Sequence, residues 1–428
     1  MDVLLINPRN PFVEEHQPMP PLGLSSIGCF LQKNEVSTEI LDLEVRQKNF
    51  NLFDYIKKIM PKVVGISGTT ISRFESFKIA KIVKKVSSSI ITVYGGCHAS
   101  FTAEDTLQNI SDIDYIVHGE GELTFLELVS SLIKKQNNFE KIQGISFRGS
   151  DGIIKTGTHE RISDLDIIPY SRHLLEMDKY KTKLDFLNLD AAAMMTSRGC
   201  VYNCYFCSAK AIFGNIYTRR SAKNVVEEIE YCMKEFNIKG IKFFDSTFTI
   251  NKQHVLSITR EMKNRNIILP WECEIRADTV DKALLENMKS AGCYYVDIGL
   301  ESASLKVLET ICKGITPEDV LKVLQWCKEL EIKTKVFFTL GHVGESNDDM
   351  EKTIQFIEKN HELISRFAIG PYIKIFPGTK IENYAKKMGI LPPNFSWSEP
   401  LMKGVLIDKK YSPIVPILPP SIAWVWDQ

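Results

Sequence analysis

Residues 191–207 read AAAMMTSRGCVYNCYFC, in which a run of small and apolar residues leads directly into three closely spaced cysteines. The run predicts a buried strand, and the cysteines lie in the loop that follows it. Cys200, Cys204 and Cys207 stand four and three residues apart, so one loop can wrap three thiolates around one face of an iron–sulfur cubane. The fourth iron then finds no nearby cysteine. Because a catalytic metal site keeps one position open for its substrate, this spacing predicts a catalytic [4Fe–4S] cluster.

Two other interpretations of these cysteines are open. A zinc site with three cysteines and one histidine needs a histidine at short spacing, but His173 lies 27 residues before Cys200 and His254 lies 47 residues after Cys207. The other interpretation is three unrelated thiols. The glycine before the loop and the aromatic Phe206 before the last cysteine favour the cluster.

Strand and helix patterns alternate from residue 191 to residue 385. Strands are predicted at 191–196, 240–245, 271–275, 294–299, 334–339 and 367–373, and helices at 224–236, 253–264, 282–291, 317–330 and 348–360. Six such units predict a partial (β/α)6 TIM-like barrel over 191–385. Functional side chains should gather at the carboxyl ends of its strands.

The preceding residues alternate in the same way and predict a second α/β domain. Runs of β-branched residues at 3–6, 37–41, 63–67, 91–94 and 115–117 are separated by helical patterns at 22–32, 52–60, 74–86 and 122–134. This predicts a Rossmann-like, doubly wound parallel sheet over 1–135. We expect 136–190 to be a linker with a hairpin at 144–155, and the Pro-rich, aromatic residues 386–428 to be a tail that packs on the barrel.

Composition excludes several classes of protein. The chain has 428 residues, of which 44% are hydrophobic and 25% are charged, a normal balance for two globular domains. Lys+Arg and Asp+Glu number 53 each, so no overall field attracts nucleic acid. No stretch approaches the ~20 apolar residues that span a bilayer, and the N-terminus does not resemble a signal peptide. We expect a cytoplasmic protein without membrane insertion.

At the cysteine loop the sequence resembles the radical S-adenosylmethionine (SAM) superfamily, whose signature is Cys-x3-Cys-x2-Cys with an aromatic residue before the last cysteine. The resemblance implies that SAM chelates the open iron through its amino and carboxylate groups. It also implies that one electron then breaks the sulfonium C–S bond, giving methionine and a 5′-deoxyadenosyl radical. An electron donor such as flavodoxin or ferredoxin is therefore an expected partner.

Residues at successive strand ends suit a SAM pocket. Asp245 ends the second barrel strand and could accept hydrogen bonds from the SAM ammonium, although a turn aspartate is an equal interpretation. Arg276 ends the third strand and could clamp the SAM carboxylate, or could instead pair with Asp278. Gly299 ends the fourth strand and permits close approach of a ligand, while Glu301 could bond Arg276 or a ribose hydroxyl.

Small residues also mark the strand ends of the first domain, in the segments PPLGLSSIG at 20–28, VGISGT at 64–69, YGGCHAS at 94–100 and VHGEGE at 117–122. In an open parallel sheet this edge holds the ligand. As a set these motifs resemble the cobalamin-binding domain found ahead of radical SAM barrels. The resemblance implies that cobalamin contacts Gly23, Ser67, Thr69, Gly95, Gly96, Gly119 and Glu120. For His98 two interpretations are open: it neighbours the corrin, or it caps a loop. There is no Asp-x-His-x-x-Gly motif, so no protein imidazole is expected on cobalt, and a domain that has lost the cofactor is also open.

The combined resemblance predicts a cobalamin-dependent methyltransferase that methylates an unactivated carbon of a small-molecule or natural-product substrate. A radical SAM cyclase or rearrangement enzyme, with or without cobalamin, is the nearest alternative. A methylthiotransferase would carry three further cysteines for a second cluster and a basic RNA-binding module, and neither is evident. A non-catalytic metal-binding protein is the alternative from another class.

Overall fold

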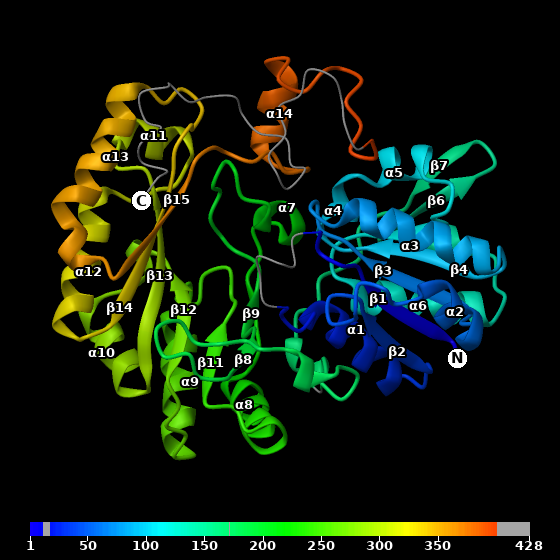
Figure 1. Ribbon diagram of the computed structural model, residues 1–428, viewed down its shortest axis with the longest axis horizontal. Coiled ribbons are helices and arrows are strands. Elements are labelled where there is room, and N and C mark those ends of the chain that lie inside the picture. Colours follow the sequence, from blue (N-terminus) through cyan, green and yellow to red (C-terminus); the bar gives the residue numbers. More distant parts are fainter. Residues whose placement is uncertain (12–17, 171, 400–428) are drawn as a thin grey trace. The chain divides into compact units, whose positions relative to one another are not determined.

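The computed structural model describes residues 1–11, 18–170 and 172–399, which form two compact units (Figure 1). Residues 1–181 and 394–399 belong to the first unit, and residues 182–393 to the second. Within the described residues no helix is long and apolar enough to cross a membrane.

The first unit is built on a seven-stranded sheet of order β2-β1-β3-β4-β5-β6-β7. Its strands are β1 (Val3–Asn7), β2 (Thr38–Asp42), β3 (Val63–Ser67), β4 (Ile91–Gly95), β5 (Tyr115–Val117), β6 (Ile145–Gly149) and β7 (Gly152–Lys155). The first five strands are parallel, and their order reverses between β1 and β3. In such sheets ligands bind at the carboxyl edge beside this reversal.

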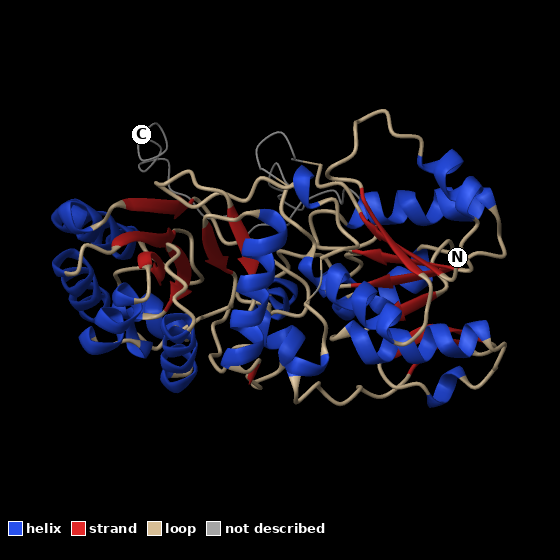
Figure 2. Ribbon diagram, turned by 90° about the horizontal axis from the view of Figure 1, so that it is seen from below, coloured by secondary structure: helices blue, strands red, loops and turns tan. Residues whose placement is uncertain are grey.

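Helices cover both faces of this sheet (Figure 2). They are α1 (Leu22–Lys33), α2 (Leu52–Ile59), α3 (Arg73–Val86), α4 (Cys97–Phe101), α5 (Ala103–Asn109) and α6 (Gly121–Ile133). Leu31 of α1 packs with Leu128 of α6 in one core, and Ile56 of α2 packs with Val83 of α3 in the other. The predicted Rossmann-like, doubly wound fold is therefore confirmed.

The predicted hairpin extends the first sheet. β6 pairs antiparallel with β5, and β7 pairs with β6. The described residues around it include the short 3-10 helices η2 (Phe139–Lys141), η3 (Leu165–Ile167) and η4 (Met177–Lys179). Residues 145–155 thus complete the edge of the sheet, because β5 offers unpaired backbone groups on that side.

The second unit is the predicted partial barrel, with six parallel strands in the order β15-β14-β13-β12-β11-β8. Its strands are β8 (Ala191–Met194), β11 (Gly240–Phe243), β12 (Trp271–Ile275), β13 (Cys293–Glu301), β14 (Lys333–Thr339) and β15 (Arg366–Gly370). The main helices are α8 (Ala222–Phe236), α9 (Lys252–Asn264), α10 (Lys282–Ser290), α12 (Pro317–Glu329) and α13 (Asn347–Asn360). Shorter elements are β9 (Ser197–Arg198), β10 (Thr218–Arg219), α7 (Ala209–Phe213), α11 (Leu305–Thr310), α14 (Lys380–Lys387), η5 (Ala277–Thr279) and η6 (His361–Leu363).

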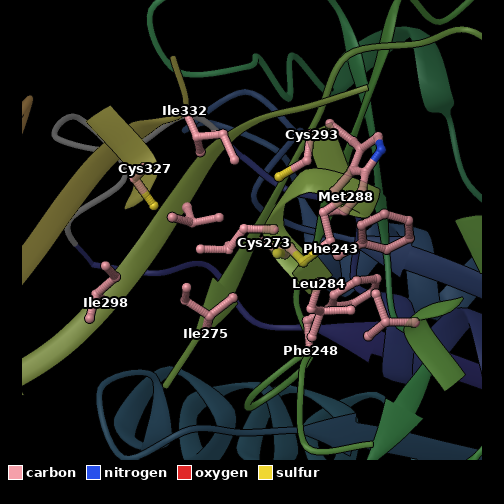
Figure 3. Packing of buried hydrophobic residues seen from close by; sticks show 14 of the residues in the cluster. Phe243, Phe248, Cys273, Ile275, Leu284, Met288, Cys293, Ile298, Cys327 and Ile332 are labelled. Atoms are coloured by element: carbon pink, nitrogen blue, oxygen red, sulfur yellow. The ribbon is translucent and has the colours of Figure 1, made fainter. Parts of the chain in front are cut away.

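Alternation along the strands decides which side chains reach the interior of the barrel. On β12, Trp271, Cys273 and Ile275 point outward into the core beneath the helices, part of which is shown in Figure 3. Glu274, between the last two, therefore points inward. The interior is consequently polar at this level, whereas the layer between sheet and helices is apolar.

The described residues of the predicted tail divide between the two units: residues 386–393 belong to the barrel unit, and residues 394–399 do not. Residues 394–399 belong to the first unit, where Arg73 Nε donates to the carbonyl oxygen of Trp397 over 3.0 Å. Ser398 Oγ donates to Asp105 Oδ2 over 2.6 Å. The Trp397 ring is buried and packs against the His98 ring. Hydrophobic periodicity in the sequence does not predict this contact. Residues 400–428 lie outside the described residues.

Candidate active site

The three cysteines occupy one loop at the carboxyl end of β8, between β9 and α7. Gly199 begins the loop at φ +89°, a conformation that glycine adopts without strain. Cys200 and Cys204 are half-buried, and Cys207 is exposed. Desolvation of the Cys207 sulfur by the surrounding protein atoms raises its pKa, and the Cys204 and Cys200 thiols raise it further, so the three sulfurs share one electrostatic environment.

The chemistry of this donor set fits an iron–sulfur cluster, since three soft thiols share one loop. Within the described residues no three His, Cys, Asp or Glu side chains are arranged as a formed metal site. The loop is anchored from outside, because Tyr205 N donates to the carbonyl oxygen of Ile311 over 2.8 Å. The contact with Ile311 therefore fixes the middle of the loop that carries the three cysteines.

Asp245 supports the start of the cysteine loop. Its carboxylate is 1% exposed and accepts hydrogen bonds from the Thr196 backbone N–H at 3.1 Å and the Thr196 hydroxyl at 2.9 Å. It also accepts a hydrogen bond from Ser197 Oγ. Burial raises the pKa of Asp245, and these hydrogen bonds oppose that shift. The prediction placed Asp245 toward the SAM ammonium, but its oxygens are engaged by the chain itself.

Arg276 is likewise engaged by its own chain. It pairs in bidentate fashion with Asp278, at 3.0 Å from Nε and 3.0 Å from a terminal nitrogen, and it donates to the carbonyl oxygen of Lys313 at 2.7 Å. Its guanidinium lies 3.5 Å from the centre of the Tyr202 ring and 3.8 Å from Cys204 Sγ. Arg276 therefore pairs with Asp278, the second of its two predicted roles, in a buried position beside the loop that carries the cysteines.

A buried ion pair closes the end of β13. Lys313 Nζ donates to Glu301 Oε1 over 2.8 Å, and neither residue is more than 8% exposed. Thr339 Oγ1 donates to the other carboxylate oxygen of Glu301 over 3.3 Å. Gly299 makes room for the pair, because a Cβ there would lie 2.7 Å from Glu301 Oε1 and 2.8 Å from Lys313 Nζ. Glu301 itself has φ +74°, at an irregularity in the β13–β14 register.

Phe206 contacts a histidine that the sequence did not single out as a site residue. Its ring centroid is 6.1 Å from that of His342, which is 1% exposed. Burial lowers the pKa of His342 to about 4. The imidazole is therefore neutral at physiological pH, and its Nε2 has no hydrogen-bond partner among the described residues.

The barrel interior carries a row of ionisable side chains. The strand register places Glu274 of β12 beside Asp297 of β13, and Asp297 beside Lys335 of β14. Glu274 is accessible, yet the surrounding protein and the Asp297 carboxylate raise its pKa to about 7. Adjacent like charges are unfavourable unless a cation neutralises them. Lys335 offsets one of the two carboxylates, so the row keeps an excess of acidic groups and is suited to a positively charged ligand group.

In the first unit, the residues predicted to contact cobalamin lie at or just beyond strand carboxyl ends, except Gly23, which lies in the first turn of α1. Gly23, Thr69, Gly96 and Gly119 are exposed, while Ser67 and Gly95 are half-buried strand ends. A Cβ at Gly23 or Gly119 would meet nothing within 4 Å. The open backbone at this edge fits a large flat ligand such as cobalamin, which needs close approach rather than deep enclosure.

Two of the residues considered for cobalamin contact bond other parts of the chain instead. His98 is 0% exposed, and its Nδ1 is 3.1 Å from Thr70 Oγ1, so it caps a loop and does not face the rim. Glu120 accepts from Arg161 Nε and from the backbone N–H of Ile162, both at 3.2 Å. Its carboxylate thus holds a neighbouring segment in place.

Lys313, His342 and Glu274 are the residues that the sequence analysis missed. Lys313 follows a helix of only six residues, which gives no periodic signal. Glu274 was detectable, since it stands between the outward-facing Cys273 and Ile275. His342 lies in a glycine-containing segment after β14, where a loop histidine carries little information.

Comparisons with known proteins agree with this arrangement. The pattern of the radical SAM superfamily matches residues 194–357, and that of the B12 binding domain matches residues 13–129. An uncharacterized methyltransferase of Pyrococcus horikoshii is 35% identical over 369 residues, which cover 86% of this chain and 78% of that protein.

A second relative and a solved structure extend the comparison. The anaerobic magnesium-protoporphyrin IX monomethyl ester cyclase of Rubrivivax gelatinosus is 27% identical, over 87% of this chain and 66% of that protein. The radical SAM methyltransferase TsrM from Kitasatospora setae, solved with tryptophan substrate and a SAM analogue, has a TM-score of 0.79 at 20% identity and covers 91% of this chain and 76% of that one. This structural likeness shows that the two chains share a fold.

Proposed function

Because this chain belongs to the cobalamin-dependent radical SAM methylase-like family, we propose that it transfers a methyl group to an unactivated carbon of a small-molecule substrate. Its cofactors are a [4Fe–4S] cluster, SAM and cobalamin. The observation that carries the proposal is the joint presence of both domains and a relative at 35% identity that is named a methyltransferase. Membership of this family is compatible with many substrates, so the substrate class is part of the proposal.

Cys200, Cys204 and Cys207 would hold the cluster, which when bound with SAM supplies a radical that abstracts hydrogen from substrate. The chain's own contribution is to position the loop. Asp245 fixes its start through Thr196 and Ser197, and Ile311 accepts a hydrogen bond from its centre. An open fourth position requires such external support, because the ligands alone do not determine the direction in which the loop faces.

We assign SAM recognition to charged residues that can still make hydrogen bonds to a ligand. Glu274 is the accessible carboxylate of the barrel interior, suited to an ammonium group. Lys313 is a buried cation whose ammonium donates one side-chain hydrogen bond within the described chain, to Glu301, so it keeps donors for a carboxylate. Asp245 and Arg276 are positioning residues in this proposal, since their polar atoms are satisfied within the chain.

Cobalamin would lie on the open edge formed by Gly23, Thr69, Gly96 and Gly119, and when bound it supplies the methyl group. Exposed glycines allow backbone amides to approach a planar ligand. His98 is buried and His118 has both ring nitrogens within hydrogen-bonding distance of Ser100 and Ser146. In this proposal, therefore, neither of these two histidines supplies an imidazole to cobalamin.

Turnover with SAM carrying a deuterated methyl group tests the proposal. The reconstituted protein, reduced by flavodoxin or dithionite without oxygen, should move the label into product when supplied with candidate small molecules. The C204A variant, with cobalamin bound, is the matched control. Formation of 5′-deoxyadenosine with an unlabelled, rearranged or cyclised product would instead support the cyclase alternative, which the relative from Rubrivivax gelatinosus favours.

Iron analysis tests the remaining alternatives. One cluster predicts about four irons per chain, whereas a methylthiotransferase with a second cluster predicts about eight. Zinc at the three cysteines without SAM binding would support a non-catalytic metal-binding protein. The electron donor is proposed on chemical grounds, because reductive cleavage of SAM consumes one electron.

A further inference from the structure

A short segment near the end of the described chain returns to the first unit. Residues 394–399 pack on the Rossmann-like unit, although the intervening residues 182–393 form the second. Trp397 and Ser398 are buried there. The segment is bonded at two points, from Arg73 Nε to the Trp397 carbonyl at 3.0 Å and from Ser398 Oγ to Asp105 Oδ2 at 2.6 Å.

The Trp397 ring completes a buried polar network. It meets the His98 ring edge to face at 5.8 Å, and the Arg73 guanidinium lies 5.8 Å from the Trp397 ring centre and 4.1 Å from that of Phe74. Arg73 also donates to the carbonyl oxygen of Thr70, whose hydroxyl is 3.1 Å from His98 Nδ1. Each of these groups is nine-tenths or more buried except Phe74.

This network connects the two loops that carry Thr69 and Gly96 of the open edge. Thr70 lies in the loop between β3 and α3, and His98 lies in α4 just after β4. The loops are also bonded directly, since Gly68 N donates to Gly95 O at 3.0 Å and His98 N donates to Gly68 O at 3.3 Å. A Cβ at Gly96 would lie 2.8 Å from Gly68 O, so the backbones of the two loops are in direct contact.

We propose that residues 394–399 are a strap that holds these two loops in the conformation that binds cobalamin, with Trp397 as its positioning residue. The inference rests on the proposed cobalamin edge, because Thr69 and Gly96 are its exposed members in these loops. Without the strap, His98 and Arg73 would be opened to water and both loops would gain freedom. Ligand binding would then have to restore their order, which lowers affinity.

Titration of the purified full-length protein with aquacobalamin, followed by the corrin absorbance, tests the strap. W397A should weaken cobalamin binding about tenfold or more, whereas W397F, which keeps an aromatic ring against His98, should remain close to the parent protein. W326A removes a half-buried tryptophan from α12 of the second unit and is the matched control. Iron content and SAM binding should be unchanged in W397A.

Hydrogen exchange provides the second readout. In the cobalamin-free W397A protein, amides of residues 68–72 and 96–100 should exchange faster while those of β1 and β2 keep their protection. S398A removes only the hydrogen bond to Asp105 and should weaken cobalamin binding by less than W397A does. If W397A does not fold, S398A tests the strap in its place. Parent-like cobalamin affinity in a folded W397A would overturn the strap. Absence of cobalamin binding by the parent protein would instead overturn the proposed cobalamin edge.

Discussion

Lys313 and Glu301 form a buried ion pair, with 2.8 Å between Nζ and Oε1, at the carboxyl end of β13. The Lys313 backbone lies beside the loop that carries the cysteines, because Arg276 donates to the Lys313 carbonyl oxygen and also approaches Cys204. One connected set of charges therefore joins a strand end, a helix end and the cluster loop.

Removing one member of this pair should cost more than removing both. K313M leaves the Glu301 carboxylate buried without its cation, and breaking a buried pair in this way costs about 3–5 kcal/mol of unfolding free energy. The double variant K313M/E301L replaces both charges by apolar groups and should be markedly more stable than K313M. Urea unfolding followed by circular dichroism measures both. Equal losses in the two proteins would show that the pair is not electrostatically coupled.

Asp245 should control assembly of the cluster. D245N keeps the size of the side chain but replaces one acceptor oxygen by a donor nitrogen, which opposes the N–H and O–H groups of Thr196 and Ser197. Iron content after anaerobic reconstitution should fall well below the about four atoms expected for one cluster. D297N, which neutralises a carboxylate on β13, is the control and should load iron normally. Full iron in D245N would contradict a positioning role.

Much of the fold follows from local patterns. The barrel helices begin where the sequence offers caps, as at Ser221, Asn251 and Asp281, whose side chains accept hydrogen bonds from backbone N–H groups three residues on. α11, with six residues, is too short to show a helical period. The destination of Trp397 depends on a contact with Arg73, 324 positions away in the chain, which no local pattern encodes.

The candidate site was predictable in part. The spacing of Cys200, Cys204 and Cys207 identifies the loop because ligand geometry depends on short separations. Asp245 and Arg276 were identified as strand-end residues, but the sequence does not reveal that Thr196 and Asp278 occupy their polar atoms. Whether a polar side chain faces a ligand or its own chain is decided by tertiary packing.

Gly299 should be needed for SAM binding more than for folding. In G299A the new Cβ would lie 2.7 Å from Glu301 Oε1 and 2.8 Å from Lys313 Nζ, which are the mobile ends of long side chains. The pair should shift while the strand persists, so SAM affinity should fall about tenfold or more with little change in melting temperature. G370A on β15 is the matched control, since its Cβ would meet Thr339 at an ordinary 3.5 Å. Calorimetric titration with SAM would detect the difference, and unaltered affinity in G299A would contradict the site.

Glu274 should give stability a defined pH dependence. Desolvation by the surrounding protein and the Asp297 carboxylate raise the pKa of Glu274 from 4.5 to about 7, so between these values the folded protein retains a proton that the unfolded chain releases. The free energy of unfolding contributed by this group therefore falls as pH rises through that window. E274Q stays uncharged and should lose less stability than the parent protein between about pH 5 and about pH 7. E309Q, at an exposed position of α11, controls for the loss of one negative charge.

Because a cationic ligand favours the ionised carboxylate, SAM affinity should also rise with pH through about 7 in the parent protein and vary less in E274Q. Parallel pH profiles of the parent protein and E274Q, in both unfolding and SAM titration, would remove Glu274 from the site.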